Sequence, residues 1–262
     1  MTTLDTLRER YTDVKARIAK AADRTNRNAS SVMLVAVTKY AGIDQVRELY
    51  QMGHRDFGEN QVQQLLQRAA MFDEWRTRQT GPGRTTPPPE PPRWHAIGHL
   101  QRNKVRKALE VVRLVHSVDS LRLAEEIQAA ATKLDHTIDV LVQVNASGER
   151  SKFGCAIAAA PHLAEQIDTM VNVRVRGLMT MAAPAEDPED ARETFARTRE
   201  LFDEIHKAGI GEGHFNILSM GMSNDYEVAI SEGANLVRIG SAIFGAPVTH
   251  PGDEPEEPEE LD

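Results

Sequence analysis

The sequence predicts an α/β fold, a (β/α)8 TIM barrel of parallel strands with one extra helix before the first strand. Two observations support this fold class: eight short apolar runs recur along the chain, and amphipathic helical segments lie between them. Repeated strand–helix units make neighbouring strands pair in parallel through right-handed crossovers. Eight such units in 262 residues fit a closed barrel better than an open doubly wound sheet.

The first element is an amphipathic N-terminal helix. Its apolar residues are spaced by three or four and form one stripe to bury, namely Leu4, Leu7, Tyr11, Val14 and Ile18. The candidate strands follow at 32–39, 54–60, 93–100, 114–119, 139–146, 173–180, 214–221 and 236–244. The first of these, VMLVAVTK, has the continuous apolar run that is typical of a strand buried on both faces.

Helical patterns fill the intervals between strands, and the clearest are IDQVRELYQMG, SLRLAEEIQAAATKL and PEDARETFARTRELFDEIHKAG. We expect Gly209 to close the last of them as a C-terminal cap. An open sheet in two halves is the structural alternative. However, TKYAGID after the first strand lacks the glycine-rich turn that binds dinucleotides.

Two segments depart from the strand–helix pattern. Residues 77–92, TRQTGPGRTTPPPEPP, hold six prolines and two glycines, which predicts an irregular, flexible surface insertion. We interpret its PPPEPP stretch as a spacer, with a polyproline ligand as the alternative. Residues 248–262 are expected to be a disordered acidic tail, which leaves residues 1–247 as a single domain.

The charge balance argues against a nucleic-acid partner. The formal charge is −8, but residues 251–262 hold seven acids and no bases, and elsewhere 32 acids face 31 bases. Binding by counterion release requires a basic surface. A single cysteine, Cys155, allows no intramolecular disulfide, and no segment approaches the roughly 20 apolar residues of a membrane helix. With no signal-like apolar stretch at its charged N-terminus, the chain is expected to be cytoplasmic, with no membrane partner.

Polar or functional residues follow several predicted strands, and a barrel brings these strand ends to one mouth. Lys39 ends the first strand, Asn60 the second and Met179 the sixth. Burying an ammonium group is costly unless it is paired, neutralised or used covalently. Lys39 is therefore either a surface charge or a chemical group.

The turns after the seventh and eighth strands predict an anion site. Ser219, Gly221 and Ser223 lie in LSMGMSND, and Gly240 and Ser241 lie in RIGSA. Glycines let backbone amides approach a ligand, hydroxyls add donors, and loops at this position commonly bind phosphate in such barrels. The alternative is that Ser223 only caps a helix and the glycines only turn the chain.

A phosphate site opposite Lys39 predicts a phosphorylated carbonyl compound held as a Schiff base, with desolvation and a nearby cation lowering the lysine's pKa. A class I aldolase and a pyridoxal 5'-phosphate site both fit. Arg238 favours the second, because it shares a strand face with Gly240, where a ring nitrogen would lie within its reach. A guanidinium cannot accept a proton, so a ring bound there would stabilise carbanions poorly.

Between residues 32 and 245 the chain resembles the pyridoxal phosphate homeostasis protein family, the YggS and PROSC group. The motifs are VAVTKY, FGENQVQQL, WHAIGHLQRNKVRKAL, HSVDSLRLAEEI, VQVNASGERSKFG, RGLMTMA and LSMGMSNDYEVAISEGANLVRIGSAIFG. The resemblance implies a fold type III barrel like the N-terminal barrel of alanine racemase. It also implies these roles: Lys39 as the Schiff-base lysine, Arg238 as the ring-nitrogen partner, Ser219, Gly240 and Ser241 as phosphate contacts, and Asn60 and Met179 as lining of the ring pocket.

The same resemblance implies control of vitamin B6 and amino-acid levels by buffering or delivering the cofactor, with apo-enzymes as partners and no catalytic residue. An amino-acid racemase is the enzyme alternative. Racemases of this fold use a second domain and a partner's tyrosine, whereas only a proline-rich acidic tail follows Phe244 here, which favours a monomer. Tyr40, Ala41 and Gly42 stand where many relatives have a basic residue and a proline, which argues against a neighbouring cation in cofactor release.

Three further residues are interpreted as structural. His95 and His99 are four apart on a strand, roughly 13 Å, too far to share a metal, so no metal site is expected. Lys152 is expected to be a surface loop lysine, with transient cofactor binding as the alternative. Cys155 is expected to be a small buried residue rather than a nucleophile.

Overall fold

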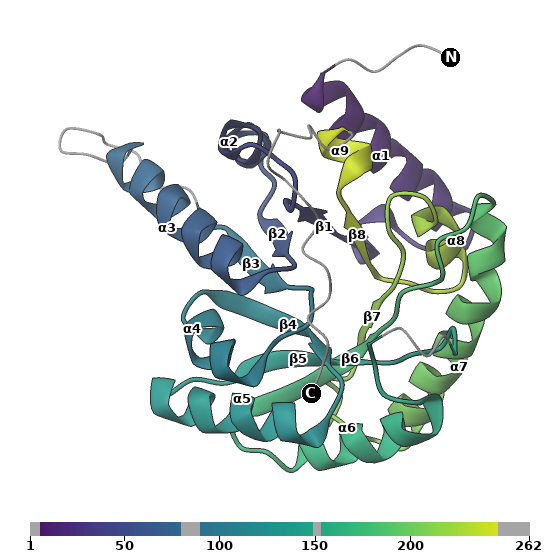
Figure 1. Cartoon of the computed structure of the whole chain (residues 1–262). Coiled ribbons are helices and arrows are strands. Elements are labelled where there is room, and N and C mark those ends of the chain that lie inside the picture. The colour runs from purple at the N-terminus through teal and green to yellow at the C-terminus, as the bar shows by residue number, and fades with distance from the viewer. Residues whose placement is uncertain (1–5, 80–89, 149–152, 246–262) are drawn as a thin grey trace.

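Parallel strands close into a barrel in the order β1 to β8 in the computed structural model, which describes residues 6–79, 90–148 and 153–245 (Figure 1). The strands are Met33–Val37 (β1), Asp56–Glu59 (β2), Arg93–Ala96 (β3), Val112–Val118 (β4), Ile138–Gln143 (β5), Val173–Met179 (β6), Ile217–Ser219 (β7) and Leu236–Ile239 (β8). β8 pairs back onto β1, with Val35 opposite Arg238. The predicted closed barrel and its eight strands are confirmed.

Helices form the outer layer around the barrel (Figure 1). They are Leu7–Asp23 (α1), Ile43–Gln51 (α2), Val62–Gln79 (α3), Val105–Leu109 (α4), Leu121–Leu134 (α5), Ala160–Asp168 (α6), Arg192–Lys207 (α7), Tyr226–Ser231 (α8) and Ser241–Phe244 (α9). Gly209 follows the end of α7 with φ +79°, and its N–H donates to the His206 carbonyl, as expected of a C-terminal cap.

The extra N-terminal helix covers the part of the barrel next to α9, which is a short helix. α1 packs against α8 and α9, and Arg10 Nε donates to the carbonyl of Ile243 at 2.8 Å (Figure 1). Its predicted stripe is buried at Leu7, Tyr11, Val14 and Ile18, while Leu4 lies outside the described residues. Because α9 has only four residues, α1 takes over much of the cover that a full eighth helix would give.

The barrel has an inner and an outer core. The larger apolar cluster lies between strands and helices, and a smaller one lies inside the barrel: Val35, Leu114, Leu141, Met179 and Leu236. Since side chains alternate across a strand, the positions two residues further on also face inward. On β4 and β8 these positions hold His116 and Arg238, so the inner core is partly polar.

The structure corrects several predicted boundaries. The strand predicted at 93–100 ends at Ala96, so His99 lies beyond it, and the strand predicted at 214–221 spans only Ile217–Ser219. The strand predicted at 236–244 ends at Ile239, and Ser241–Phe244 form α9, because the N–H groups of Ile243 and Phe244 turn back to the Gly240 carbonyl at 2.9 Å. Thr77–Gln79, predicted to be irregular, form the last turn of α3, since the first proline comes only at position 82. Residues 80–89 of the predicted insertion, Lys152 and the predicted tail 248–262 lie outside the described residues.

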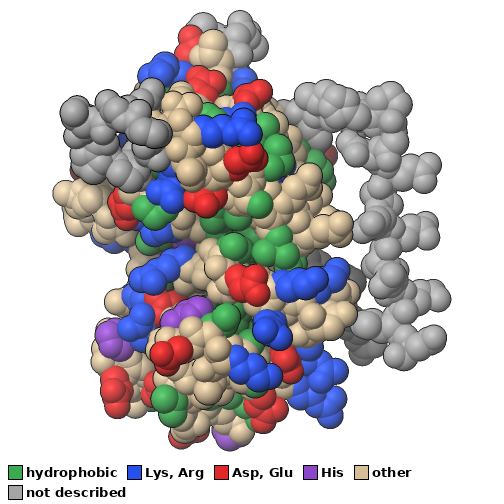
Figure 2. Space-filling view, turned by 90° about the vertical axis from the view of Figure 1, so that its left-hand side faces the viewer, with side chains coloured by type: hydrophobic (Ala, Val, Ile, Leu, Met, Phe, Trp, Pro, Cys, Tyr) green, Lys and Arg blue, Asp and Glu red, His purple; other side chains and the backbone are tan. Residues whose placement is uncertain are grey.

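The surface shows no gathering of basic side chains on the face drawn in Figure 2, where Lys and Arg are interspersed with Asp and Glu. This agrees with the near balance of charges outside the C-terminal segment. Among the described residues, none of the helices is both long enough and apolar enough to cross a membrane.

Candidate cofactor-binding site

Lys39 follows the end of β1 at the mouth of the barrel. Its side chain is exposed, and its ammonium lies 4.6 Å from the centroid of the Tyr40 ring, within range of a cation–π contact. The predicted desolvation of this amine by the protein alone is therefore not observed. The residue before it is fixed, because the Thr38 hydroxyl is buried and donates to a carboxylate oxygen of Glu59 at 2.5 Å.

Glu59, the last residue of β2, anchors the segment that carries Lys39. Its buried carboxylate accepts a hydrogen bond from Thr38 and forms an ion pair with Arg68 of α3, with 2.6 Å between Oε1 and Nε. Burial raises the pKa of this carboxyl, although the hydrogen bond from Thr38 and the charge of Arg68 oppose the rise. The contacts tie the turn after β1 to both β2 and α3. Sequence reasoning missed this anchor, although Glu59 was visible as the acid directly before Asn60.

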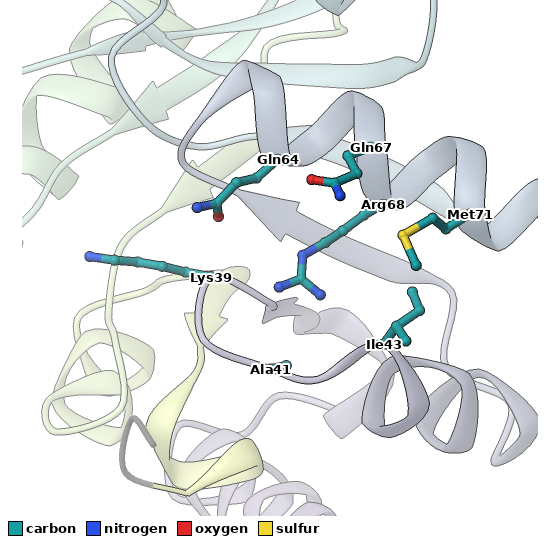
Figure 3. Close-up of a pocket in the computed structure, with 7 residues that line it drawn as sticks. All are labelled: Lys39, Ala41, Ile43, Gln64, Gln67, Arg68 and Met71. Atoms are coloured by element: carbon teal, nitrogen blue, oxygen red, sulfur yellow. The ribbon is translucent and has the colours of Figure 1, made fainter. Parts of the chain in front are cut away.

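A pocket of about 300 Å³ lies beside Lys39, between the start of α2 and α3. It is lined by Lys39, Ala41, Ile43, Gln64, Gln67, Arg68 and Met71. Lys39 and Gln64 lie at one end, Ile43 and Met71 at the other, and the Arg68 guanidinium lies between them (Figure 3). The pocket therefore combines guanidinium and amide donors with apolar surface next to the lysine.

Arg238 is a buried cation in the inner core, on the strand next to β1. It is 3% exposed, its Nη1 donates to Ser219 Oγ at 2.6 Å, and its Nη2 donates to the Thr180 carbonyl at 2.9 Å. Burial lowers the pKa of Arg238 to about 10, although the charge of Asp225 opposes this shift. No carboxylate of the described residues forms a salt bridge with it. A buried guanidinium that has only neutral hydrogen-bond partners favours binding of a further acceptor.

The turns after β7 and β8 meet, as predicted. Ser223 Oγ accepts from the N–H groups of Gly240 and Ala242, at 3.2 and 3.3 Å, at the start of α9, where Ser241 also stands. In this structure Ser223 thus does what the alternative interpretation proposed, since it caps these amides. The same amides and hydroxyls form a group of donors suited to an anion.

Gly221 links the turn after β7 to β8. Its carbonyl accepts from the backbone N–H of Arg238 at 3.0 Å. Its φ is +95°, and a Cβ atom there would lie 2.6 Å from the Ala229 Cβ. Only glycine combines this backbone conformation with so close an approach, so the bend that places the turn depends on it.

The remaining predicted site residues occupy two different places. Met179 ends β6 in the inner apolar cluster, and Ser219 ends β7 beside it, fully buried and bonded to Arg238. Ser219 therefore lies inside the barrel, below the turn that contains Ser223. Asn60 follows β2, and its Oδ1 is buried without a hydrogen-bond partner among the described residues. Such an acceptor is available to a ligand in the mouth.

The two histidines considered as metal ligands point to different surroundings. His95 is buried, with its Nδ1 3.0 Å from His116 Nε2, whereas the ring of His99 stacks on Phe153 with centroids 4.4 Å apart. No cluster of metal-binding side chains occurs in the described part of the chain. Sequence reasoning missed His116. Its spacing of two from Leu114 places both on the same face of β4, and the structure shows that this face points into the barrel.

Cys155 was predicted to be buried, but its side chain is only partly buried in the structure. Burial raises the pKa of its thiol to about 11, so the nucleophilic thiolate is scarce at neutral pH.

Known proteins similar to this chain share both its sequence and its fold. The alanine racemase N-terminal domain family matches residues 11–247. The pyridoxal phosphate homeostasis protein of Pseudomonas aeruginosa is 39% identical over 243 residues, which cover 93% of this chain and 96% of that protein. The chain belongs to the pyridoxal phosphate homeostasis protein family.

Solved structures agree with this family assignment. PipY of Synechococcus elongatus with PLP bound is 31% identical, with a TM-score of 0.71, and the match covers 87% of this chain and 100% of PipY. An alanine racemase of Clostridium difficile is 16% identical, with a TM-score of 0.66, and the match covers 95% of this chain but 58% of the racemase. The racemase therefore shares the barrel fold with this chain.

Proposed function

We propose that this protein binds pyridoxal 5'-phosphate covalently at Lys39 and acts in cofactor homeostasis, by buffering or delivering it, without robust catalysis. The observation that carries the proposal is Arg238, a buried cation that forms no salt bridge with an acid of the described residues and lies on β8, beside β1, the strand that precedes Lys39. PipY, whose structure was solved with PLP bound, supports the choice of cofactor. When bound, the cofactor supplies an aldehyde that reacts with an amine and a ring that accepts electrons.

Each candidate residue has a role in this proposal. Lys39 supplies the amine, and its exposure lets the cofactor enter and leave without a large rearrangement. Arg238 donates to the ring nitrogen and, because a guanidinium does not take up a proton, keeps that nitrogen unprotonated. An unprotonated ring is a weak electron sink, which suits a protein that holds the cofactor rather than one that transforms amino acids.

The phosphate is proposed to bind where the turns after β7 and β8 meet. Gly221 shapes the first turn, while Ser223, Gly240 and Ser241 supply hydroxyl and amide donors. Asn60 and Met179 are proposed to line the ring. Ser219 is proposed to support Arg238 rather than to touch the phosphate, because its buried hydroxyl already contacts the guanidinium.

Sequence similarity favours homeostasis over racemisation. The chain is 39% identical to the Pseudomonas aeruginosa homeostasis protein but 16% identical to the alanine racemase. A class I aldolase is disfavoured by the family assignment. We further propose a cytoplasmic monomer that passes the cofactor to apo-enzymes, and the single cysteine with its raised thiol pKa suits a reducing compartment.

Borohydride reduction of the protein after incubation with pyridoxal 5'-phosphate tests the site. Mass spectrometry of the digest is expected to find one added pyridoxyl group, on Lys39, and Lys39→Ala is expected to lose it together with the visible absorbance band. Lys133→Ala, which removes a lysine from α5, is the matched control and should label as wild type does. Absence of the band in wild type with added cofactor would refute the proposal.

Turnover and delivery are tested separately. Long incubation with single L-amino acids followed by chiral analysis is expected to show no robust racemisation, and rapid formation of D-isomers would assign the racemase function instead. The loaded protein is expected to reactivate a cofactor-free PLP enzyme. If a reduced, Lys39-linked sample reactivates it equally well, free cofactor in the solution explains the effect and delivery is refuted.

A further inference from the structure

A continuous chain of buried polar side chains crosses the inside of the barrel from Arg238 to Asp56. It contains one residue from each of β8, β7, β4, β3 and β2. The successive contacts are Arg238 Nη1 to Ser219 Oγ at 2.6 Å, Ser219 Oγ to His116 Nδ1 at 3.2 Å, His116 Nε2 to His95 Nδ1 at 3.0 Å, and His95 Nε2 to Asp56 Oδ1 at 3.2 Å. All five residues are buried.

The far end of this chain is a fixed negative charge. Asp56 begins β2, so it lies at the end of the barrel opposite the mouth, where Arg93 donates Nε and Nη2 to its two oxygens at 2.7 Å each. Burial by itself raises the pKa of Asp56, but the hydrogen bonds from Arg93 and His95 outweigh it and hold the pKa well below the ordinary value. Asp56 is therefore ionised at neutral pH and only accepts hydrogen bonds.

The two charged ends limit the directions of the hydrogen bonds between them. Arg238 only donates and Asp56 only accepts, and burial lowers the pKa of His116 well below its ordinary value, so that imidazole is neutral. When His95, like His116, carries a single proton, one arrangement satisfies all four contacts. His95 donates from Nε2 to Asp56, His116 donates from Nε2 to His95, and Ser219 donates to His116 Nδ1.

This order of protons has a consequence for Arg238. Because the Ser219 hydroxyl donates its proton to His116, Ser219 Oγ accepts a hydrogen bond from Arg238 Nη1 through a lone pair. The Thr180 carbonyl accepts from Arg238 Nη2. The guanidinium is thus oriented by two neutral acceptors, and although the charge of Asp225 acts on it, it forms no salt bridge with a carboxylate of the described residues. A ligand acceptor gains more from such a cation than from one already in an ion pair.

We propose that Ser219, His116 and His95 are positioning residues that hold Arg238 toward the ring nitrogen of the bound cofactor and link it to Asp56 at the other end of the barrel. The inference rests on the proposed function in naming the ligand. The hydrogen-bonded chain itself is a property of the protein without cofactor. The two parts can therefore be tested apart.

The first test uses the protein without cofactor. Nitrogen-15 NMR of the imidazole rings is expected to show His116 neutral at pH 7, with its proton on Nε2. A proton on Nδ1 would reverse the chain and overturn the proposal, whether or not the protein binds the cofactor. A wild-type protein that binds no pyridoxal 5'-phosphate would refute the proposed function. The NMR measurement would still show whether the hydrogen bonds run in the proposed direction.

The second test interrupts the chain and measures the cofactor. His116→Asn keeps a polar atom near Ser219 but removes Nε2, and His95→Gln removes Nδ1 while leaving an amide near Asp56. Each is expected to weaken binding of pyridoxal 5'-phosphate about three- to tenfold, as the loss of about one net hydrogen bond would do, and to shift the bound cofactor's absorbance spectrum. Having two variants keeps the test available if one does not fold.

His54→Gln is the matched control. His54 is also buried near Asp56, but its ring hydrogen-bonds to the Asp56 backbone carbonyl and the Tyr11 hydroxyl and packs edge-on against Phe57, so it makes none of the four hydrogen bonds of the chain. It is expected to lower thermal stability without changing the cofactor's spectrum or affinity. Chain variants that lose stability but keep the wild-type spectrum and affinity would show that the chain is only structural and would refute the proposal.

A double-mutant cycle tests the route through Ser219. If His95 acts on the cofactor through Ser219, adding His95→Gln to Ser219→Ala is expected to change affinity no further. Fully additive losses would contradict action through the chain.

Discussion

Replacing Arg238 with methionine separates the effect of the buried charge on folding stability from its effect on cofactor affinity. Burial lowers the pKa of Arg238 to about 10, which corresponds to about 3 kcal/mol against the charged form in the folded state. Because the pKa of a cation is lowered, this penalty opposes folding at every pH below about 10 and is relieved only above it. Methionine removes the penalty at nearly unchanged volume.

The same substitution also removes the hydrogen bonds to Ser219 and Thr180. Leaving these two acceptors without Arg238 costs about 1–3 kcal/mol each. The two effects oppose each other, so the free energy of unfolding of Arg238→Met without cofactor is expected to stay within about 3 kcal/mol of wild type. Affinity for pyridoxal 5'-phosphate is expected to fall about 10- to 150-fold, because one charge-assisted hydrogen bond to the ring nitrogen is lost.

Urea unfolding without cofactor and spectroscopic titration with cofactor measure the two quantities. Arg238→Lys keeps the charge but loses the planar fork, so its affinity should also fall, and Arg122→Met, on the exposed face of α5, should change neither quantity. Wild-type affinity in Arg238→Met would refute the assignment of Arg238 to the ring nitrogen. A loss of stability above about 5 kcal/mol would show instead that Arg238 serves mainly to hold the inner core together.

Three further predictions concern the turn, the far end of the barrel and the cysteine. Gly221→Ala, which places a methyl group 2.6 Å from the Ala229 Cβ at φ +95°, is expected to lower unfolding free energy by about 1–3 kcal/mol and weaken cofactor binding, and an unchanged Tm would contradict this. Asp56→Asn is expected to destabilise the protein by about 2–4 kcal/mol at neutral pH because it breaks the pairing with Arg93. Since the pKa of Asp56 is lowered, the stability it adds is present above its ordinary value of 3.8 and is lost as pH falls below that, so urea unfolding should find a smaller difference at pH 2 to 3 than at pH 7. Cys155, with a thiol pKa of about 11, is expected to react with a disulfide reagent at pH 8 at least tenfold more slowly than free cysteine, and equal rates would refute the raised thiol pKa.

The sequence by itself determined the barrel and the place of its mouth. Eight apolar runs separated by helical patterns leave parallel pairing as the efficient way to bury them, and parallel strands end on the same side. Lys39, Asn60 and the two glycine–serine turns could therefore be assigned to one site before any coordinates were known. The sequence was sufficient for this assignment, because each of these residues follows a predicted strand.

The tertiary structure decided what lies beneath the mouth. Strands of a parallel barrel are buried on both faces, so their apolar runs do not reveal which residues face inward. The register between two strands also cannot be predicted from the sequence of either strand alone. For this reason Ser219 was predicted in the phosphate turn but lies inside the barrel against Arg238, and His95 was judged only by its distance to His99. The contacts of Ser219, His116 and His95 join residues 21 and 103 positions apart, and only the closed barrel brings them together.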